Sequence, residues 1–520
     1  FCYLLYTNTF KGFFVSNRPP RWLVALIVLI SLPLLLPFLY VIERAADVGL
    51  ARSIELLWRP RMWELLSNTL LLMVFVTLFA IILGTLCAFL LERYRFCGKG
   101  FFQVAITLPL CIPAFVSCFT WISLTFRVEG LWGTIGIMTL SSFPLAYLPV
   151  AATLKRLDRS LEEVSLSLAK SQAYTFWHAI FPQLKPAIGS SVLLIALHML
   201  VEFGAVSILN YQTFPTAIFQ EYEMAFNNNT AALLSGVLMV ICILVVMGEI
   251  RFRGTQTLYQ SGKGVIRPYP LKTLSVGKQI LVVSFFTTIF VLSIGVPITM
   301  LIYWLKVGNS IESAVDFGEF FTAFTNSLTI STLGAALTVI CALPLVWAAV
   351  RYRSKLTIWL DRIPYLLHAV PGLVIALSLV FFTINYAYSL YQTFAMVVVA
   401  YFMLYLPMAQ TTLRGSLEQM SDNIEKVGQS LGRSNFYIFR TLVIPAMLPG
   451  IAAAFALVFL NLMKELTATL LLTPNDIKTL STAVWEYTSD AQYAAATPYA
   501  IMLVLFSGIP VFLLKRYGFK

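Results

Sequence analysis

The chain has 520 residues, of which 59% are apolar and only 12% are charged, whereas a soluble protein carries roughly 25% charged residues. The apolar residues come in blocks of about twenty, long enough to cross a hydrocarbon layer of roughly 30 Å. This pattern excludes a soluble multidomain protein and indicates a polytopic membrane protein. The seven cysteines have no framework spacing, which excludes a secreted disulfide scaffold. The net charge of +12 does not indicate a nucleic-acid partner, because the basic residues lie in short loops between the apolar blocks.

Twelve of these blocks are predicted to be transmembrane helices. In chain order they cover residues 22–41, 69–91, 102–126, 135–154, 187–209, 231–248, 279–305, 327–350, 363–382, 393–412, 448–470 and 494–514. Most Lys and Arg residues lie before the first block, after the last block and in every second loop. Short cytoplasmic loops carry an excess of positive charge, so both termini are predicted to be cytoplasmic.

The pattern of six spans occurs twice along the chain. Matching segments include Asn68 and Asn326, Arg93-Tyr94-Arg95 and Arg351-Tyr352-Arg353, and Tyr147-Leu148-Pro149 and Tyr405-Leu406-Pro407. Six spans return the chain to the side where it started, so the two copies are expected to be parallel repeats related by an axis along the membrane normal. The expected organisation is a first membrane domain over 1–253, a cytoplasmic linker over 254–274 and a second membrane domain over 275–520.

The strongest motif lies between the fourth and fifth spans of each copy. The segment Leu161-Glu162-Glu163-Val164 recurs as Ile424-Glu425-Lys426-Val427, and both copies continue through Tyr-x-Phe to a proline, Pro182 or Pro445. A short amphipathic helix is predicted, because Leu161, Val164 and Leu168 share one helical face, as do Ile424, Val427 and Leu431. An ordinary solvated loop is the alternative, but it does not explain why the pattern recurs.

A bend is expected directly after each short helix. Ala169 or Gly432 permits it, and glycine in particular tolerates a left-handed backbone at a helix end. The two prolines are expected to interrupt the helix that precedes the next span. The result is a rigid elbow on the cytoplasmic side.

These elbows resemble the Glu-Ala-Ala loop of the membrane subunits of bacterial ABC importers. The triplet positions are Glu163-Val164-Ser165 and Lys426-Val427-Gly428, the glycine position is Ala169 or Gly432, and the family glutamate is therefore kept only in the first copy. The resemblance implies an all-α, type I ABC importer permease fold in a bacterial inner membrane. It also implies two coupling helices that dock on two separate ATP-binding subunits, with Glu162, Glu163, Ala169, Glu425, Lys426 and Gly432 as coupling residues.

The chain contains no Gly-x4-Gly-Lys-Ser/Thr phosphate loop. ATP is therefore expected on the partner subunits, and the chain is expected to be a transport subunit rather than an enzyme, with no cofactor of its own. A carrier driven by an ion gradient shares the six-plus-six topology and is one alternative. A channel or scaffold is another, but it would not give the elbows a function.

Ionisable residues inside spans are functional candidates, because they are costly in a bilayer. Glu202 and Glu465 are related by the repeat, and each follows a proline that opens its span. Each is expected well along a continuous helix, and together they could offer oxygen ligands to a metal ion. A local ion pair with Lys464 is the competing interpretation. His198 is interpreted as an interhelical hydrogen-bonding residue rather than a ligand.

Three strings resemble the fused permeases of bacterial ferric-iron importers. They begin at Glu202-Phe203-Gly204, Val370-Pro371-Gly372 and Lys464-Glu465-Leu466. This resemblance implies that a periplasmic iron-binding protein delivers Fe(III) to the outer face. Permeases for thiamine, sulfate, polyamines and phosphonate have related strings and remain alternatives. The segments that start at Thr216 and Thr482, after Glu202 and Glu465, are expected to form interfacial helices at the outer boundary. Docking of another protein on these segments is the alternative.

Overall fold

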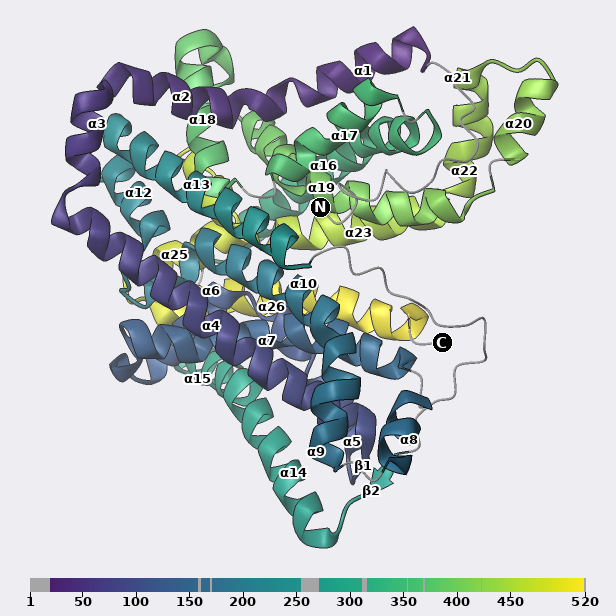
Figure 1. Ribbon diagram of the computed structural model, residues 1–520. Helices are drawn as coiled ribbons and strands as arrows, with labels where there is room; N and C mark the ends of the chain where they lie inside the picture. The colour runs from purple at the N-terminus through teal and green to yellow at the C-terminus, as the bar shows by residue number, and fades with distance from the viewer. Residues whose placement is uncertain are drawn as a thin grey trace. The chain divides into compact units, whose positions relative to one another are not determined.

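The computed structural model describes residues 19–157, 160–168, 171–253, 271–310, 316–352, 354–367, 370–421 and 423–518. It is almost entirely helical (Figure 1). Within the described ranges, the strands are two residues each, β1 (Tyr94–Arg95) and β2 (Lys272–Thr273), which pair in parallel. The predicted all-α class is confirmed.

Most helices of the first repeat have a counterpart in the second, and the long helices α4, α7 and α13 match α16, α19 and α26 in order and closely in length. The first repeat contains α1 (Arg21–Ser31), α2 (Leu36–Val48), α3 (Leu50–Leu57), α4 (Pro60–Arg93), α5 (Lys99–Ala105), α6 (Ala114–Leu124), α7 (Leu131–Arg156), α8 (Ser160–Ser167), α9 (Gln172–Thr175), α10 (Phe181–Val201), α11 (Gly204–Ile208), α12 (Phe214–Glu223) and α13 (Asn228–Arg253). The second contains α14 (Val276–Phe290), α15 (Val296–Ser310), α16 (Phe317–Arg351), α17 (Lys355–Leu367), α18 (Gly372–Tyr386), α19 (Phe394–Gln419), α20 (Asn423–Ser430), α21 (Asn435–Ile438), α22 (Ile444–Ala446), α23 (Leu448–Met463), α24 (Thr467–Leu472), α25 (Leu480–Ser489) and α26 (Tyr493–Gly518).

Each predicted span has a counterpart among these elements. Among the described residues, eight helices are long and apolar enough to cross a membrane, three bent helix pairs each form one further candidate span, and Tyr493–Gly508 is a shorter apolar helix. The bend between Lys99–Cys111 and Ala114–Leu124 is 93°, and the bend between Asn435–Ala446 and Leu448–Met463 is 71°.

Contacts divide the chain into two compact units that interleave along the sequence. The α4 unit contains Leu57–Ala217, Val240–Val315 and the chain from Val484 onward, and the α16 unit contains the chain up to Leu56, Ile218–Met239 and Asp316–Ala483. In the α4 unit, α10 packs on α4 and α7, and α15 from the second repeat packs on α6 and α26. In the α16 unit, α23 packs on α16 and α19, while α1 packs on α16 and α17 and α2 packs on α18.

Each repeat therefore contributes its first span to the unit built around the other repeat. The predicted division at 254–274 describes repeats along the sequence and stays a prediction, because most of that linker lies outside the described residues. On α1, Leu23 and Ile27 are almost completely buried, whereas Leu29 and Leu32 on the other side are exposed. One face of the first span is thus committed to protein contact, and the opposite face is available to lipid.

Matching hydrogen bonds support the repeat at residue level. The side-chain amide of Asn68 donates to the carbonyl of Gln212 at 3.1 Å, and that of Asn326 donates to the carbonyl of Lys478 at 3.1 Å. Both pairs fasten the start of a long helix to the segment before α12 or α25. The two asparagines matched in sequence thus have the same structural task.

The expected continuous fifth spans are interrupted. Helix α10 ends at Val201 and α11 begins at Gly204, while α23 ends at Met463 and α24 begins at Thr467. Glu202 and Glu465 therefore lie in the breaks rather than inside continuous helices, so that part of the prediction was wrong. The physical reason is that each carboxylate accepts backbone N–H groups of the helix that follows.

The expected outer helices are present as α12 and α25, and residues of their first turns are buried, while their place at the membrane boundary stays a prediction. Thr216, Ala217 and Ile218 are buried in α12, as are Thr482 and Ala483 in α25. Their apolar side chains are covered by protein, which the pattern of apolar and acidic residues did not reveal.

Helices α4 and α7 lie close together at Gly84. A Cβ atom at this position would lie 2.6 Å from the carbonyl oxygen of Phe143 and 2.8 Å from the backbone nitrogen of Tyr147. Small residues at such crossings let membrane helices approach each other closely, because packing rather than hydrophobicity holds them together.

We expect Gly84→Ala to destabilise the protein by about 1–3 kcal/mol, because the new methyl group meets backbone atoms that cannot move aside. Gly136→Ala, on α7, is the matched control, since a Cβ there meets nothing within 4 Å and alanine favours the helix by up to about 1 kcal/mol. The thermal unfolding midpoint of the purified protein measures both effects. Equal midpoints for the two variants would show that the close approach at Gly84 is not needed.

Candidate functional site

The two predicted elbows fold as short helices, α8 and α20, at equivalent places in the two repeats. Both carry acidic residues in the first turn, namely Glu162 and Glu163 in α8 and Glu425 in α20. Acidic side chains are favourable there, because the N-terminal end of a helix has a partial positive charge. The sequence thus favours a helix start at the same point in both copies.

Each of these helices is anchored by a buried ion pair. Glu162 pairs with Arg93 at the end of α4, and the Oε1 atom of Glu425 lies 2.6 Å from the Nε atom of Arg351 at the end of α16. All four residues have side chains at most 12% exposed. A buried charge is costly without a partner, so each glutamate holds its helix against the end of a long helix.

The second ion pair has additional partners. The indole N–H of Trp347 donates to Oε2 of Glu425 at 3.3 Å, and Arg351 also donates to the carbonyl of Met420 at 3.2 Å. Burial raises the pKa of the nearby Tyr352 phenol to about 12, and the negative charge of Glu425 acts in the same direction. Tyr352 therefore stays neutral at physiological pH and adds no charge to the pair.

The third triplet position must be small. A Cβ atom on Gly428 would lie 2.9 Å from Cγ1 of Ile438, because α20 packs directly on the helix that follows it. In the first copy this position is Ser165, whose hydroxyl group is 2.8 Å from that of Thr175. Both copies bring the short helix against the next one at this point, through an apolar contact in one and a polar contact in the other.

The bend after α20 occurs as predicted at Gly432, which has a left-handed φ of 70°. Ala169, the equivalent residue, lies outside the described residues. The next helix starts at a serine in both copies, where the hydroxyl groups of Ser171 and Ser434 accept the N–H groups of Tyr174 and Tyr437 at 3.2 and 3.3 Å. Such caps satisfy backbone donors that have no partner inside the helix.

The two prolines differ from expectation. Pro182 lies within a helix that runs from Phe176 to Val201, whereas in the second copy the helix ends at Ala446, after Pro445. A π-helical turn precedes each proline, Phe176–Ile180 and Phe439–Val443. The π turn changes the local hydrogen bonding at the point where a proline leaves a backbone carbonyl without its usual donor. The prediction of an interruption is therefore wrong for Pro182 and holds for Pro445.

Each elbow has exposed apolar residues on the side that faces away from the protein. Val164 is 56% exposed and Leu168 is exposed after α8, and Val427 is 58% exposed with Leu431 exposed after α20. The side chains of Leu161 and Ile424, predicted on the same faces, are outside the described residues. Exposed apolar residues at matching positions of both elbows are typical of surfaces that interact with another molecule.

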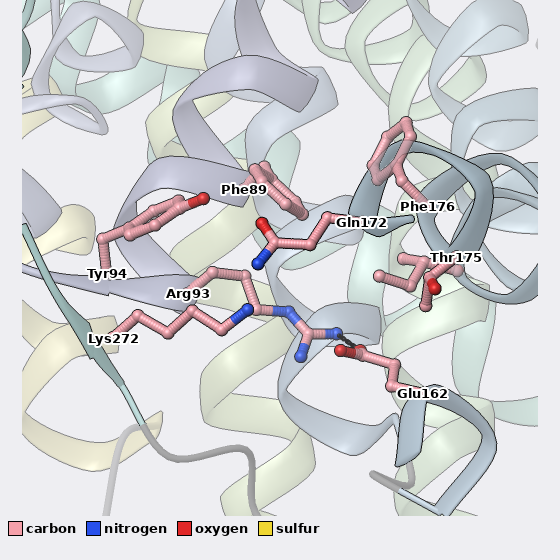
Figure 2. Close-up of a pocket in the computed structure, with 9 residues that line it drawn as sticks. Phe89, Arg93, Tyr94, Glu162, Gln172, Thr175, Phe176 and Lys272 are labelled. Carbon is pink, nitrogen blue, oxygen red and sulfur yellow. Dashed lines mark ion pairs between the residues drawn. The ribbon is translucent and has the colours of Figure 1, made fainter. Parts of the chain in front are cut away.

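A small pocket lies behind α8 in the α4 unit (Figure 2). It is lined by Phe89, Arg93, Tyr94, Glu162, Gln172, Thr175, Phe176, Ile180 and Lys272. Figure 2 shows the Arg93–Glu162 pair at its base and Lys272 of β2 beside Tyr94. The strand pairing of Tyr94 with Lys272 thus brings the end of the predicted linker next to the first elbow.

The predicted coupling residues fall into distinct roles. Glu162 and Glu425 are buried anchors, Glu163 is exposed, and Gly432 forms the bend. Lys426 lies within α20, but its side chain is outside the described residues. The sequence analysis missed Arg93, Arg351 and Trp347 as anchors, although the recurrence of Arg93 as Arg351 was a signal that could have identified two of them.

Glu202 and Glu465 have similar but unequal surroundings. Oε1 of Glu202 accepts the N–H of Ala205 at 3.1 Å, and Oε2 lies 3.7 Å from Nε2 of His198. The carboxylate of Glu465 accepts the N–H groups of Ala468 and Thr469 at 3.2 Å and the hydroxyl of Thr469 at 2.9 Å. Both glutamates cap a short helix. They lie in different units, so their shared role toward an ion stays a prediction.

Metal-ligand clusters were sought among the residues that the structure describes. In that part of the chain, no group of three or more His, Cys, Asp or Glu residues is placed to hold a metal ion. His198 has Nε2 at 3.7 Å from Glu202, four residues further along the same segment. The arrangement therefore offers two separate carboxylates and two anchored elbows.

Comparison with known proteins relates both repeats to one family. The family described as "Binding-protein-dependent transport system inner membrane component" matches residues 80–250 and again 342–517. The chain is 80% identical, over 97% of its length and 100% of the relative, to the Fe(3+)-transport system permease protein FbpB 2 of Haemophilus influenzae.

More distant relatives align with a smaller share of this chain. The ferric transport system permease protein FbpB of Actinobacillus pleuropneumoniae is 23% identical over 85% of this chain and 69% of that protein. The sulfate transport system permease protein CysT of Escherichia coli is 29% identical over 35% of this chain and 70% of that protein. These matches confirm the predicted resemblance to multi-pass permeases of ABC importers, which are transport subunits rather than enzymes. The chain belongs to the family of inner-membrane components of binding-protein-dependent transport systems and carries its characteristic domain twice.

Proposed function

We propose that this permease moves ferric iron inward across the bacterial inner membrane, from a periplasmic iron-binding protein and with both termini in the cytoplasm. The main support for ferric iron as the substrate is the 80% identity to an Fe(3+)-transport permease over the whole length of that relative. The sulfate permease match is lower and covers about a third of the chain, so sulfate is the weaker candidate.

Two ATP-binding subunits drive this transport by docking on α8 and α20. Support comes from the exposed apolar residues Val164 and Val427, which occupy equivalent positions on the two helices. Glu162 and Glu425 face the opposite way, into the protein. Each short helix thus has one side fixed to its own unit and one side free for a partner, as required of an element that transmits a rigid-body movement.

We expect the double variant Val164→Asp, Val427→Asp to bind the ATP-binding subunits roughly thirtyfold more weakly, the effect of losing about 2 kcal/mol at an interface hot spot. A charge introduced at each surface would have to lose its water on docking. Co-purification of the ATP-binding subunits with the permease measures the effect.

Met224→Asp is the matched control, because Met224 is 70% exposed but lies after α12 rather than on an elbow. The control should co-purify like the unchanged protein. Undiminished co-purification of the double variant would rule out docking on these two surfaces.

The two glutamates differ in how they could meet the ion. The oxygens of Glu465 already serve two backbone N–H groups and one hydroxyl group. Glu202 accepts one backbone N–H, and its side chain is 14% exposed. We therefore assign contact with passing Fe(III) to Glu202 rather than to Glu465, which serves as a helix cap.

We expect Glu202→Gln to reduce iron uptake with little loss of stability. Glutamine keeps an oxygen that can accept the N–H of Ala205, but it has no negative charge to attract the ion. Glu465→Gln should instead lower stability by about 1–2 kcal/mol, since a charged cap at a helix N-terminus is lost. Iron uptake into proteoliposomes and the thermal unfolding midpoint are measured for both variants. Equal losses of stability in the two variants would show that both residues are only caps.

The substrate assignment has its own test. The complete transporter in liposomes, supplied with its binding protein and internal ATP, should accumulate radioactive Fe(III) and ignore sulfate, thiamine and spermidine. Uptake of iron should stop when ATP is omitted, because the chain has no phosphate loop of its own. Uptake that continues on an imposed proton gradient without ATP would favour a secondary transporter.

A further inference from the structure

An aromatic cluster surrounds the second coupling anchor. Trp347, 1% exposed, has its ring centroid 4.5 Å from that of Phe439 and 5.4 Å from that of Tyr352. Its indole N–H reaches Glu425. The orientation of the Glu425–Arg351 pair is therefore tied to the position of the Trp347 ring.

A residue from the other repeat completes this cluster. Trp22, in the first turn of α1, stacks on Trp347 with centroids 6.2 Å apart and planes at 29°. It also meets the edge of Phe436, on α21 just after the coupling helix, at 5.6 Å. Figure 1 shows the start of α1 next to α21. A single side chain thus touches both the long helix α16 and α21, the helix that directly follows the elbow helix α20.

The first elbow is held differently by the equivalent part of the chain. Phe89 there is 6.1 Å from Tyr94 and 5.3 Å from Phe176, which repeats the arrangement around Trp347. The contact here comes from β2, at the end of the predicted linker that leads into the second repeat, where Lys272 pairs with Tyr94 and lines the pocket beside Glu162. In both units, a residue at or just before the start of one repeat's first span lies next to the elbow region of the other repeat. This residue is Trp22 in the α16 unit and Lys272 in the α4 unit.

We propose that Trp22 is a positioning residue that clasps the second elbow to α1, so that movement of α20 on ATP-driven closure carries the exchanged first span with it. Lys272–Thr273 makes the corresponding clasp in the α4 unit. This inference rests on the proposed docking of ATP-binding subunits at α20. Through this contact, docking at α20 of the second repeat would move α1 of the first repeat.

The geometry favours a clasp over simple packing. Aromatic pairs prefer defined offset or edge-to-face arrangements, and Trp22 makes one contact of each kind with two different elements. A shift of α21 relative to α16 cannot leave both contacts unchanged, so it is passed on to Trp22 and through it to α1. Trp22 is still 36% exposed, so its ring does not fill the core of the unit.

The test uses the complete transporter in liposomes and measures the number of ATP molecules hydrolysed for each iron ion imported. We expect Trp22→Ala to raise this ratio about threefold, within the range by which residues between coupled sites alter coupling. ATP-binding subunits should still co-purify. Trp22→Phe should restore most of the coupling, because phenylalanine can still stack on Trp347.

Trp63→Ala is the matched control, since Trp63 is also an exposed tryptophan in the first turn of a span but contacts Trp58. Phe436→Ala gives an independent route if Trp22→Ala fails to fold, and it should raise the ratio similarly. The double variant Trp22→Ala, Phe436→Ala should be no worse than either single one, because both remove the same contact.

An unchanged ratio in Trp22→Ala and Phe436→Ala, or an equal increase in Trp63→Ala, would overturn the clasp. Failure of the proposed function would be recognised separately, because the unchanged transporter would then import no iron on ATP hydrolysis.

Discussion

The buried pair between an arginine that ends a long helix and a glutamate that begins a coupling helix is the constraint on which the elbows depend. Arg93 and Arg351 lie in the last turns of α4 and α16, and Glu162 and Glu425 lie in the first turns of α8 and α20. Each charge therefore also complements the dipole of its own helix. Removing one partner would leave the other buried and alone, which typically costs about 3–5 kcal/mol.

This anchor explains why the two copies could diverge without losing the elbow. Around it, Ser165 and Thr175 make a polar contact where Gly428 and Ile438 make an apolar one. Phe89 takes the place of Trp347, so the indole N–H that reaches Glu425 has no equivalent on the phenylalanine ring. The outer apolar surface survives in both copies. The buried ion pair on one side and the exposed apolar residues on the other thus recur in both copies, while the contacts between these two sides differ.

Much of the fold could be predicted because its signals are local. Span length, loop charge and the recurrence of Asn68 as Asn326 depend on neighbouring residues or on direct comparison of two segments. Glycine at 432 likewise predicted a left-handed bend, because the preference belongs to that residue alone.

What could not be predicted depends on contacts between residues distant in sequence. The packing of α1 on α16 joins segments some three hundred positions apart, and no periodicity of α1 specifies its partner. The same holds for the candidate site: Glu162 and Glu425 were identified as important, but their burial became visible only with Arg93 and Arg351 placed beside them. The sequence therefore located the elbows but not the direction in which their glutamates point.

The breaks at Glu202 and Glu465 connect fold and transport most directly. A helix that stops inside a bilayer leaves N–H groups that lipid cannot satisfy, so such breaks occur where protein supplies acceptors. Here a carboxylate supplies them, and each glutamate has a structural duty before any ion arrives. An ion that drew away Glu465 would strip the start of α24 of several acceptors at once, whereas Glu202 could turn one oxygen toward a cation while the other keeps Ala205. Duplication of the fold thus produced two related carboxylates that differ in their partners: both oxygens of Glu465 accept hydrogen bonds from α24, whereas Glu202 offers one oxygen to Ala205 and has the other 3.7 Å from His198.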